Sequence, residues 1–141
     1  MSEELKTSPE QELRRLIDIV STLRSPEGCP WDIEQTPESM IPFLLEEAYE
    51  VVESIEDGNQ EDILAELGDL LLHIVMQAQM AEENNNFELR DSIRSINEKL
   101  IRRHPHVFGD DNSKTKRLED AKEKWEKTKK AEGRKSWIDG V

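Results

Sequence analysis

The stretch that decides the fold is L-A-E-L-G-D-L-L-L-H-I-V-M, from Leu64 to Met76. At the 100° that each residue of an α-helix advances, its apolar side chains cover most of the circumference. Such a helix is expected to be buried on nearly all sides. Its glycine, Gly68, costs about 1 kcal/mol relative to alanine within a helix. We therefore expect another helix to approach this one closely at Gly68.

One stripe of the same helix is polar. Its members are Asp62, Glu66, Asp69 and His73, at spacings of four, three and four residues. This spacing places them on one face of the helix. Carboxylates on an otherwise buried helix are costly unless they are paired or bound to a metal ion. His73 could contact the outer shell of such a site, but a histidine in this setting is more often a core residue.

A second acidic pair, Glu47 and Glu50, lies on the preceding predicted helix, beside its apolar face. The D-G-N sequence at 57–59 predicts a tight turn between the two helices. Helices joined by a short turn run antiparallel as neighbours, so this pair can face Glu66 and Asp69. Four carboxylates without cysteine or histidine favour a hard cation. The sequence therefore predicts Mg²⁺, or Mn²⁺, as the cofactor.

Helical spacing recurs along the rest of the chain, and no β-strand alternation is present. The sequence predicts helices over residues 10–24, 36–55, 60–83, 88–103 and 117–131. A loop rich in proline and glycine, 25–32, precedes the second helix, which Thr36 is expected to cap. Pro105 is expected to end the fourth helix, and a polar loop follows over 109–115. The predicted fold class is therefore all-α, a helical bundle.

The length of 141 residues fits one domain. We expect the helical domain to cover 11–132, between a flexible tail over 1–10 and a tail or linker over 133–141. Charged residues make up 36% of the chain and hydrophobic residues 35%. The core of such a polar chain is expected to be completed by dimerisation, in a homodimer or a higher even-numbered oligomer.

The net charge is −13. This charge argues against nucleic acid and against an anionic membrane surface as partners. The single cysteine, Cys29, excludes an intramolecular disulfide and fits a reducing compartment. The polar N-terminus lacks the apolar segment of a secretory signal, and no apolar run is expected to span a bilayer. The sequence therefore predicts a cytoplasmic protein.

Several motifs follow one another in a recognisable order. They are C-P-W-D at Cys29–Asp32, Q-T at Gln35–Thr36, L-L-E-E-A-Y-E-V at Leu44–Val51, E-L-G-D-L-L at Glu66–Leu71 and K-L-I-R-R-H-P-H-V-F-G-D at Lys99–Asp110. Together they resemble the MazG family of nucleoside triphosphate pyrophosphohydrolases, over about Leu13 to Lys129. The resemblance implies an all-α domain that works as a dimer. It also implies cleavage of a nucleoside triphosphate between the α- and β-phosphates, which yields the monophosphate and pyrophosphate.

The resemblance leaves open which kind of relative this is. Many relatives carry two such domains in tandem, and Ser136–Val141 looks like the segment that precedes the second domain. The chain is either a natural single-domain form or a first half. In some tandem relatives the first half is the less active one.

The resemblance assigns Mg²⁺ binding to Glu47, Glu50, Glu66 and Asp69, the same residues that the spacing indicates. Glu46, next to them, is the candidate for orienting or deprotonating the attacking water. A surface glutamate is an equally good interpretation of Glu46. We take Glu46, Glu47 and Glu50 as the candidate catalytic residues.

Three cations end the fourth predicted helix: Lys99, Arg102 and Arg103. Lys99 and Arg103 lie four residues apart and share a face. The family assigns triphosphate contacts to these two positions, and Arg102 is the weaker candidate. Cations at a helix C-terminus also complement the helix dipole, which is the alternative interpretation.

Three more residues are candidates for nucleotide binding. Trp125 and Lys129, one turn apart, match positions that contribute to nucleotide binding in some members of the family. Trp125 would stack on the base or belong to the core. Trp31 lies in the loop rich in proline, where it would cover the base or anchor the loop, and the anchor is favoured.

Competing functions remain at this stage. A di-iron carboxylate protein needs Glu-x-x-His motifs, which neither acidic pair contains. A non-catalytic nucleotide-binding or regulatory module remains an alternative, as does a narrower pyrophosphohydrolase directed at dUTP or dCTP. The sequence does not determine the base preference.

Overall fold

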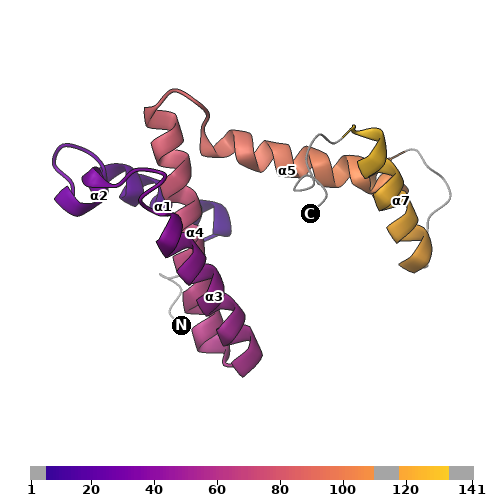
Figure 1. Ribbon diagram of the computed structural model, residues 1–141, viewed down its shortest axis with the longest axis horizontal. Helices are drawn as coiled ribbons and strands as arrows, with labels where there is room; N and C mark the ends of the chain where they lie inside the picture. Colours follow the sequence, from indigo (N-terminus) through magenta and orange to yellow (C-terminus); the bar gives the residue numbers. More distant parts are fainter. Residues whose placement is uncertain (1–5, 110–117, 134–141) are drawn as a thin grey trace. The chain divides into compact units, whose positions relative to one another are not determined.

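The computed structural model describes residues 6–109 and 118–133, whose regular structure is entirely helical (Figure 1). The helices are α1 (Pro9–Leu23), α2 (Pro30–Glu34), α3 (Ile41–Asp57), α4 (Gln60–Glu83), α5 (Leu89–Arg103), α6 (Pro105–Phe108) and α7 (Leu118–Ala131). Contacts divide the chain into two compact units, Met1–Leu89 and Arg90–Val141, and each is described by itself. The all-α prediction is confirmed.

Residues 1–5 of the predicted N-terminal tail lie outside the described residues, whereas Pro9 and Glu10 of that tail are the first residues of α1. The predicted tail over 133–141, except Gly133, and the polar loop beyond Gly109 also lie outside them. The segment Ser136–Val141 lies outside them entirely.

Side-chain caps set where α1 and α4 begin. Ser8 accepts a hydrogen bond from the Gln11 backbone, and the Gln11 side chain accepts one from the Ser8 backbone, which forms a capping box. Asn59 Oδ1 accepts from the backbone N–H groups of Glu61 and Asp62, at 3.0 and 3.2 Å. Both caps satisfy N–H groups that have no partner within the helix. The predicted bounds of α4 are confirmed.

The segment before α3 differs from the prediction. The expected loop contains the short helix α2, and α3 begins at Ile41 instead of Pro37. Thr36 does cap a turn, because its Oγ1 accepts from the Ser39 N–H at 3.1 Å. That turn ends at Met40, which is buried, and the helix starts after it. The predicted cap therefore belongs to a turn and not to α3.

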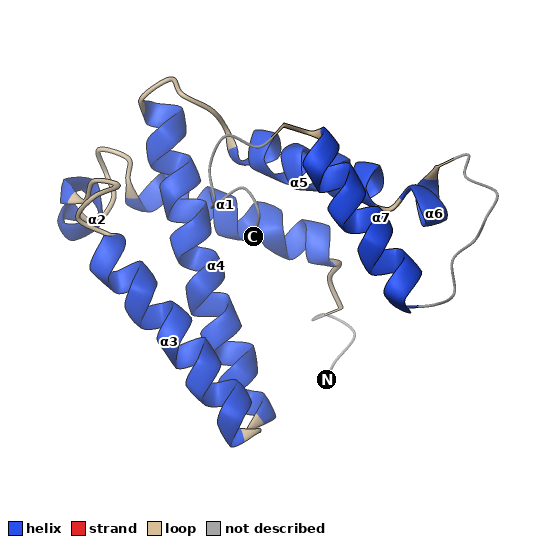
Figure 2. Cartoon of the chain, turned by 45° about the vertical axis from the view of Figure 1, so that its right-hand side comes forward, coloured by secondary structure: helices blue, strands red, loops and turns tan. Residues whose placement is uncertain are grey.

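The helices α3 and α4 form an antiparallel pair joined by a tight turn (Figure 2). Gly58 ends α3 with a φ of 72°, a left-handed conformation that glycine adopts without strain. Val51 and Ser54 are the buried residues of α3. The predicted D-G-N turn is thus confirmed, and it sets the two acidic pairs on neighbouring helices.

The core of the first unit lies where α1 meets the second half of α4. Its buried apolar residues are Val20, Met40, Val75, Met76 and Met80. All the buried residues of α4 lie between His73 and Ala81. The first half of α4 is different, because Leu64 is 75% exposed and Leu67 is 50% exposed. The expectation that α4 is buried on nearly all sides is therefore wrong within a single chain.

The expectation that another helix approaches closely at Gly68 is also wrong for the described part of a single chain. A Cβ placed on Gly68 would meet no described atom within 4 Å. Gly68 is exposed and lies on the same side of α4 as Leu64 and Leu71, at helical spacing. No other helix within residues 6–109 and 118–133 comes within 4 Å of this position.

The second unit contains nearly all of α5, together with α6 and α7. The helix α6 was not predicted, because Pro105 was interpreted as the end of α5. Proline is well suited to the first position of a helix, where no N–H partner is needed. Pro105 therefore both follows α5 and starts α6.

By length and composition alone, α4 could cross a membrane: it has 24 residues and a mean hydropathy of 1.2 over its most apolar window. The expectation that no apolar run is long enough is therefore wrong by these two criteria. Core helices satisfy the same criteria, and α4 contributes Val75, Met76 and Met80 to the core. It is the one such helix within residues 6–109 and 118–133.

Candidate metal site and basic cluster

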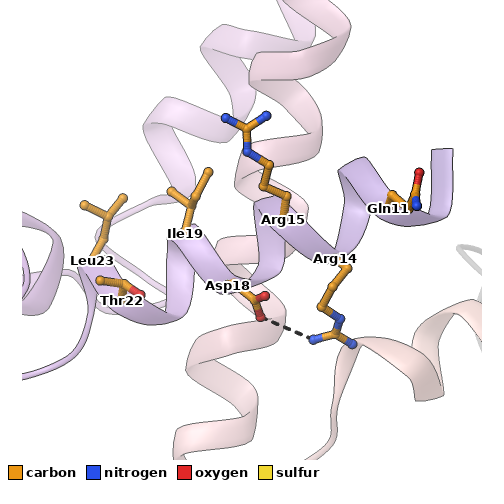
Figure 3. A pocket seen from close by; sticks show the side chains of 7 residues that line it. All are labelled: Gln11, Arg14, Arg15, Asp18, Ile19, Thr22 and Leu23. Atoms are coloured by element: carbon orange, nitrogen blue, oxygen red, sulfur yellow. Dashed lines mark hydrogen bonds and ion pairs between the residues drawn. The ribbon is translucent and has the colours of Figure 1, made fainter. Parts of the chain in front are cut away.

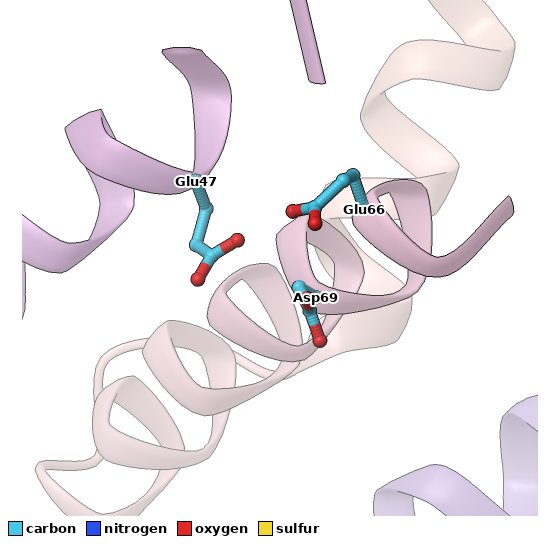
Figure 4. A group of neighbouring side chains, drawn as sticks. All are labelled: Glu47, Glu66 and Asp69. Atoms are coloured by element: carbon cyan, nitrogen blue, oxygen red, sulfur yellow. The ribbon is translucent and has the colours of Figure 1, made fainter. Parts of the chain in front are cut away.

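Three of the four predicted metal ligands lie together on the α3–α4 pair. Ligand oxygens of Glu47, Glu66 and Asp69 all lie within 4.8 Å of one another. Figure 4 shows Glu47 extending from its own helix toward Glu66 and Asp69 on the other. Glu50 lies close enough to Glu66 to share a hydrogen bond when Glu66 is protonated. The four predicted residues thus form one group, named the acidic group below.

Two members of the acidic group, Glu66 and Glu47, have raised pKa values. The pKa of Glu66 rises to about 7, first because protonated Glu66 donates a hydrogen bond to Glu50. Burial and the charges of Glu50, Asp69 and Glu47 act in the same direction. The pKa of Glu47 is also raised, chiefly by burial and then by the charges of Glu50 and Asp69. Carboxylates that repel in this way are stabilised by a proton or by a cation.

The group has the chemistry that a hard cation needs. Glu47 Oε2 and Glu66 Oε2 are buried and accept no hydrogen bond from the described residues. A buried carboxylate oxygen without a hydrogen-bond donor destabilises the fold unless a ligand binds to it. All the available donors are oxygens, which Mg²⁺ and Mn²⁺ prefer. The residues present therefore fit the predicted ion.

Two neighbours of the acidic group differ in exposure. Glu46 is exposed on α3 and is not among the clustered ligands. His73 is buried one turn after Asp69, and its Nδ1 has no hydrogen-bond partner in the part of the chain that the structure describes. His73 adjoins the core of the first unit, as expected for a core histidine, and is not one of the clustered residues.

Arg103, which is predicted to bind phosphate, packs against several polar and aromatic side chains of the second unit. It is 2% exposed, and its Nη2 donates to Glu132 Oε1 at 2.7 Å. The guanidinium lies over the Trp125 ring at 5.1 Å from the centroid. The centroids of the His104 and Trp125 rings lie 5.0 Å apart. The structure thus brings Arg103 and Trp125 together, as parts of one stack.

The other predicted cations differ from Arg103 in their surroundings. Arg102 is more exposed, and its Nε donates to Glu132 Oε2 at 2.5 Å. Lys129 is buried and lies 4.0 Å from Glu126. Lys99 is half-buried and forms no ion pair with the described residues.

Trp31 lies on α2 and is 52% exposed. Its ring meets Phe43 edge to face, with centroids 6.0 Å apart. Arg24 binds the segment that contains α2, because its Nη1 donates to the backbone carbonyls of Asp32 and Gln35. Arg24 therefore anchors the loop, and Trp31 presents about half of its surface to solvent.

Sequence reasoning missed two of these residues, Glu132 and Arg24. Glu132 lies 29 residues after Arg103, and Glu83 lies 59 residues after Arg24. No local spacing links such pairs. The one available signal was that Glu132 is an isolated acid after the basic run Lys127–Lys130.

A depression of about 450 Å³ lies elsewhere, on one face of α1. It is lined by Gln11, Arg14, Arg15, Asp18, Ile19, Thr22 and Leu23 (Figure 3). Arg14 and Asp18 pair across it at 3.5 Å. None of the acidic group lines it, and a single helix face offers no converging polar groups. We therefore place the candidate site at the acidic group.

Comparison with known proteins shows which family and which fold the chain resembles. The sequence-family model of the MazG nucleotide pyrophosphohydrolase domain matches residues 35–108 of this chain. A solved structure, the crystal structure of a mazG-related protein from Thermotoga maritima, is similar with a TM-score of 0.69 and 28% sequence identity. The similarity covers 83% of this chain and 98% of that one.

Curated relatives are similar over much of this chain. The nucleoside triphosphate pyrophosphohydrolase/pyrophosphatase MazG of Thermotoga maritima is 56% identical over 95 residues, 67% of this chain and 37% of the relative. The nucleoside triphosphate pyrophosphohydrolase of Escherichia coli K12 is 44% identical over 122 residues, 86% of this chain and 46% of the relative. The chain thus spans less than half the length of these two relatives.

Proposed function

Because this chain belongs to the MazG nucleotide pyrophosphohydrolase domain family, we propose that it hydrolyses nucleoside triphosphates in a Mg²⁺-dependent reaction. The bond cleaved is the one between the α- and β-phosphates, and the products are the nucleoside monophosphate and pyrophosphate. The names of the two relatives described above support the reaction class. The family match includes all four residues of the acidic group.

The observation that carries the proposal is the acidic group. Glu47, Glu66 and Asp69 converge from two helices, and two of their buried oxygens meet no hydrogen-bond donor from the described residues. With Glu50, these residues would hold the ion. When bound, Mg²⁺ would neutralise phosphate charge and polarise the phosphoryl group. Mn²⁺ would satisfy the same oxygen donors.

Water activation is assigned to the exposed face of α3. Glu46 adjoins Glu47 in sequence and is open to solvent. A carboxylate in that position orients the attacking water or accepts its proton. Glu46→Gln is therefore expected to lower turnover more than it lowers metal affinity.

Phosphate recognition is assigned to the basic residues of the second unit. Lys99, Arg103 and Lys129 would contact the triphosphate, with Arg102 in a lesser role. Their positive charge offsets, locally, the net charge of −13 that repels a triphosphate. Trp31 and Trp125 are the candidates for contact with the base. Base preference is left open by this assignment.

A second copy of the chain is expected to complete the core. Leu64, Leu67, Leu71 and Ile74 form an exposed apolar stripe on α4. On α3, Leu45, Tyr49, Val52 and Ile55 form another. Contiguous apolar surface of this kind marks a protein interface. We expect a homodimer or a higher even-numbered oligomer, acting in the cytoplasm without nucleic acid or membrane as partner.

The test is pyrophosphate release from a panel of nucleoside triphosphates, with Mg²⁺ and with excess chelator. Asp69→Asn is expected to abolish Mg²⁺-dependent release without unfolding the helices. Asp62→Asn is the matched control, because Asp62 is exposed on the same helix outside the clustered ligands. Triphosphate binding without any pyrophosphate release would instead identify a non-catalytic nucleotide-binding module.

A further inference from the structure

Part of the buried Arg103 guanidinium has no hydrogen-bond partner among the described residues. Its Nε and Nη2 donate to the Glu132 carboxylate, at 3.2 and 2.7 Å. Its Nη1 is buried and makes no hydrogen bond with the described residues. Leaving a buried charged donor unsatisfied is costly. The geometry therefore calls for an acceptor that the described residues of the second unit do not supply.

The charges of this cluster do not balance. One carboxylate, Glu132, serves both Arg102 and Arg103. The two guanidinium groups and the one carboxylate that they bind leave a net charge of about +1, before the more distant negative charge of Glu98 near Arg102 is counted. The hydrogen bonds from Arg102 and then Arg103 lower the pKa of Glu132 to about 2, so it is ionised at neutral pH. The residual positive charge favours an anionic acceptor.

Glu132 is itself held in place. Its backbone N–H donates to the carbonyls of Thr128 and Lys129, which extends the last turn of α7. Its side chain is 17% exposed. Glu132 binds one edge of the Arg103 guanidinium, and the Trp125 ring lies against one of its faces. Both the edge and one face of the guanidinium are therefore fixed before any ligand binds.

We infer that Glu132 is a positioning residue for triphosphate binding: it holds Arg103 by the Nε–Nη2 edge and leaves Nη1 for a phosphate oxygen. This inference rests on the proposed function, because it supposes that Arg103 meets a phosphate. A carboxylate that merely occupied the anion site would compete with the ligand. The unpartnered Nη1 favours positioning over competition, because a donor remains after Glu132 is bound.

The experiment compares Glu132→Gln with the wild-type chain in the binding of three probes. They are inorganic tripolyphosphate, a non-hydrolysable nucleoside triphosphate and the corresponding nucleoside, each measured by calorimetry at a temperature where circular dichroism shows a folded protein. We expect about tenfold or greater weakening for both polyphosphates, the equivalent of one charge-assisted hydrogen bond, and no change for the nucleoside. Glu123→Gln, an exposed glutamate on α7, is the matched control and should bind all three as the wild type does.

Coupling to Arg103 separates positioning from a general loss of structure. In the Arg103→Ala background, Glu132→Gln should weaken polyphosphate binding no further. Glu132→Asp, which keeps the charge on a shorter side chain, should retain part of the affinity and replaces Glu132→Gln if that variant does not fold. Tighter polyphosphate binding in Glu132→Gln would show competition and overturn the inference. Unchanged binding with a lowered melting temperature would overturn it too, by showing a structural role only.

Failure of the proposed function has a different outcome. If the wild-type chain neither binds polyphosphate nor releases pyrophosphate, the proposed function fails and the inference fails with it. If the wild-type chain does both and Arg103→Ala weakens binding while Glu132→Gln does not, the inference alone fails.

Discussion

Arg24 and Glu83 form a two-point ion pair that joins the C-terminal ends of α1 and α4. Arg24 Nε donates to Glu83 Oε2 at 2.9 Å, and Nη2 donates to Oε1 at 2.8 Å. The remaining nitrogen, Nη1, donates to the carbonyls of Asp32 and Gln35 around α2. The Arg24 side chain is 9% exposed. One side chain therefore connects three helices of the first unit.

Arg24→Ala is expected to lower the free energy of unfolding by roughly 2–3 kcal/mol. The reason is that charge-assisted hydrogen bonds contribute about 1.5–3 kcal/mol each. The two that Arg24 donates to the carbonyls of Asp32 and Gln35 are partly buried, whereas the pair with Glu83 is open to solvent and contributes less. Urea denaturation followed by circular dichroism measures the change. The control is Arg14→Ala, because Arg14 is 68% exposed and pairs with Asp18 on the same helix. Its effect should stay within about 0.5 kcal/mol, and equal losses in the two variants would contradict the argument.

Two glycines are expected to respond oppositely to alanine. At Gly28, a Cβ would overlap the backbone of Leu23 and Thr22, which cannot move without breaking the end of α1. Gly28→Ala should therefore be clearly destabilising in thermal unfolding. At Gly68 nothing lies within 4 Å, so Gly68→Ala should add up to about 1 kcal/mol of helix stability in the monomer. A Gly68→Ala variant that folds well but associates more weakly would place Gly68 in the interface between copies.

The acidic group should make the metal-free protein less stable as the pH rises. Because the pKa of Glu66 is raised from 4.5 to about 7, the folded chain binds more protons than the unfolded chain between these values. The stability that this proton contributes is present below pH 4.5 and is lost as the pH rises through 7. We expect a lower melting temperature at pH 8 than at pH 5.5 in chelator. Added Mg²⁺ at pH 8 should raise it again.

Glu66→Gln tests this assignment. The variant should show a smaller difference between pH 5.5 and 8 and a smaller response to Mg²⁺, since the shared charge has been removed. Glu53→Gln, an exposed glutamate on α3, should behave as the wild type does. Identical pH profiles in all three proteins would exclude Glu66 as the titrating group.

Local spacing predicted the acidic group before the structure because its parts are close in sequence. Glu47 and Glu50 are three residues apart, as are Glu66 and Asp69, and a single glycine turn joins the two helices. Each step in that inference involves one helix or one turn. The D-G-N turn at 57–59 likewise predicted the start of α4 at Gln60.

What the sequence did not predict depends on contacts between distant segments. The ion pair of Arg24 with Glu83 spans 59 residues, and that of Arg103 with Glu132 spans 29. The exposure of Leu64 depends on which helices cover α4, and the periodicity of one helix does not contain that information. Pro105 was compatible both with ending a helix and with starting one.

Leu64→Glu is expected to prevent the proposed association of two copies while leaving the helices of each chain intact. Leu64 is 75% exposed in the single chain and begins the apolar stripe of α4, so a charge there meets water in a monomer and apolar surface in a dimer. Sedimentation velocity at micromolar concentration measures the change, and circular dichroism checks the fold. Leu118→Glu is the matched control, because Leu118 is 74% exposed and lies on α7. A wild-type chain that sediments as a monomer and still releases pyrophosphate would show that the stripe does not bind a second copy.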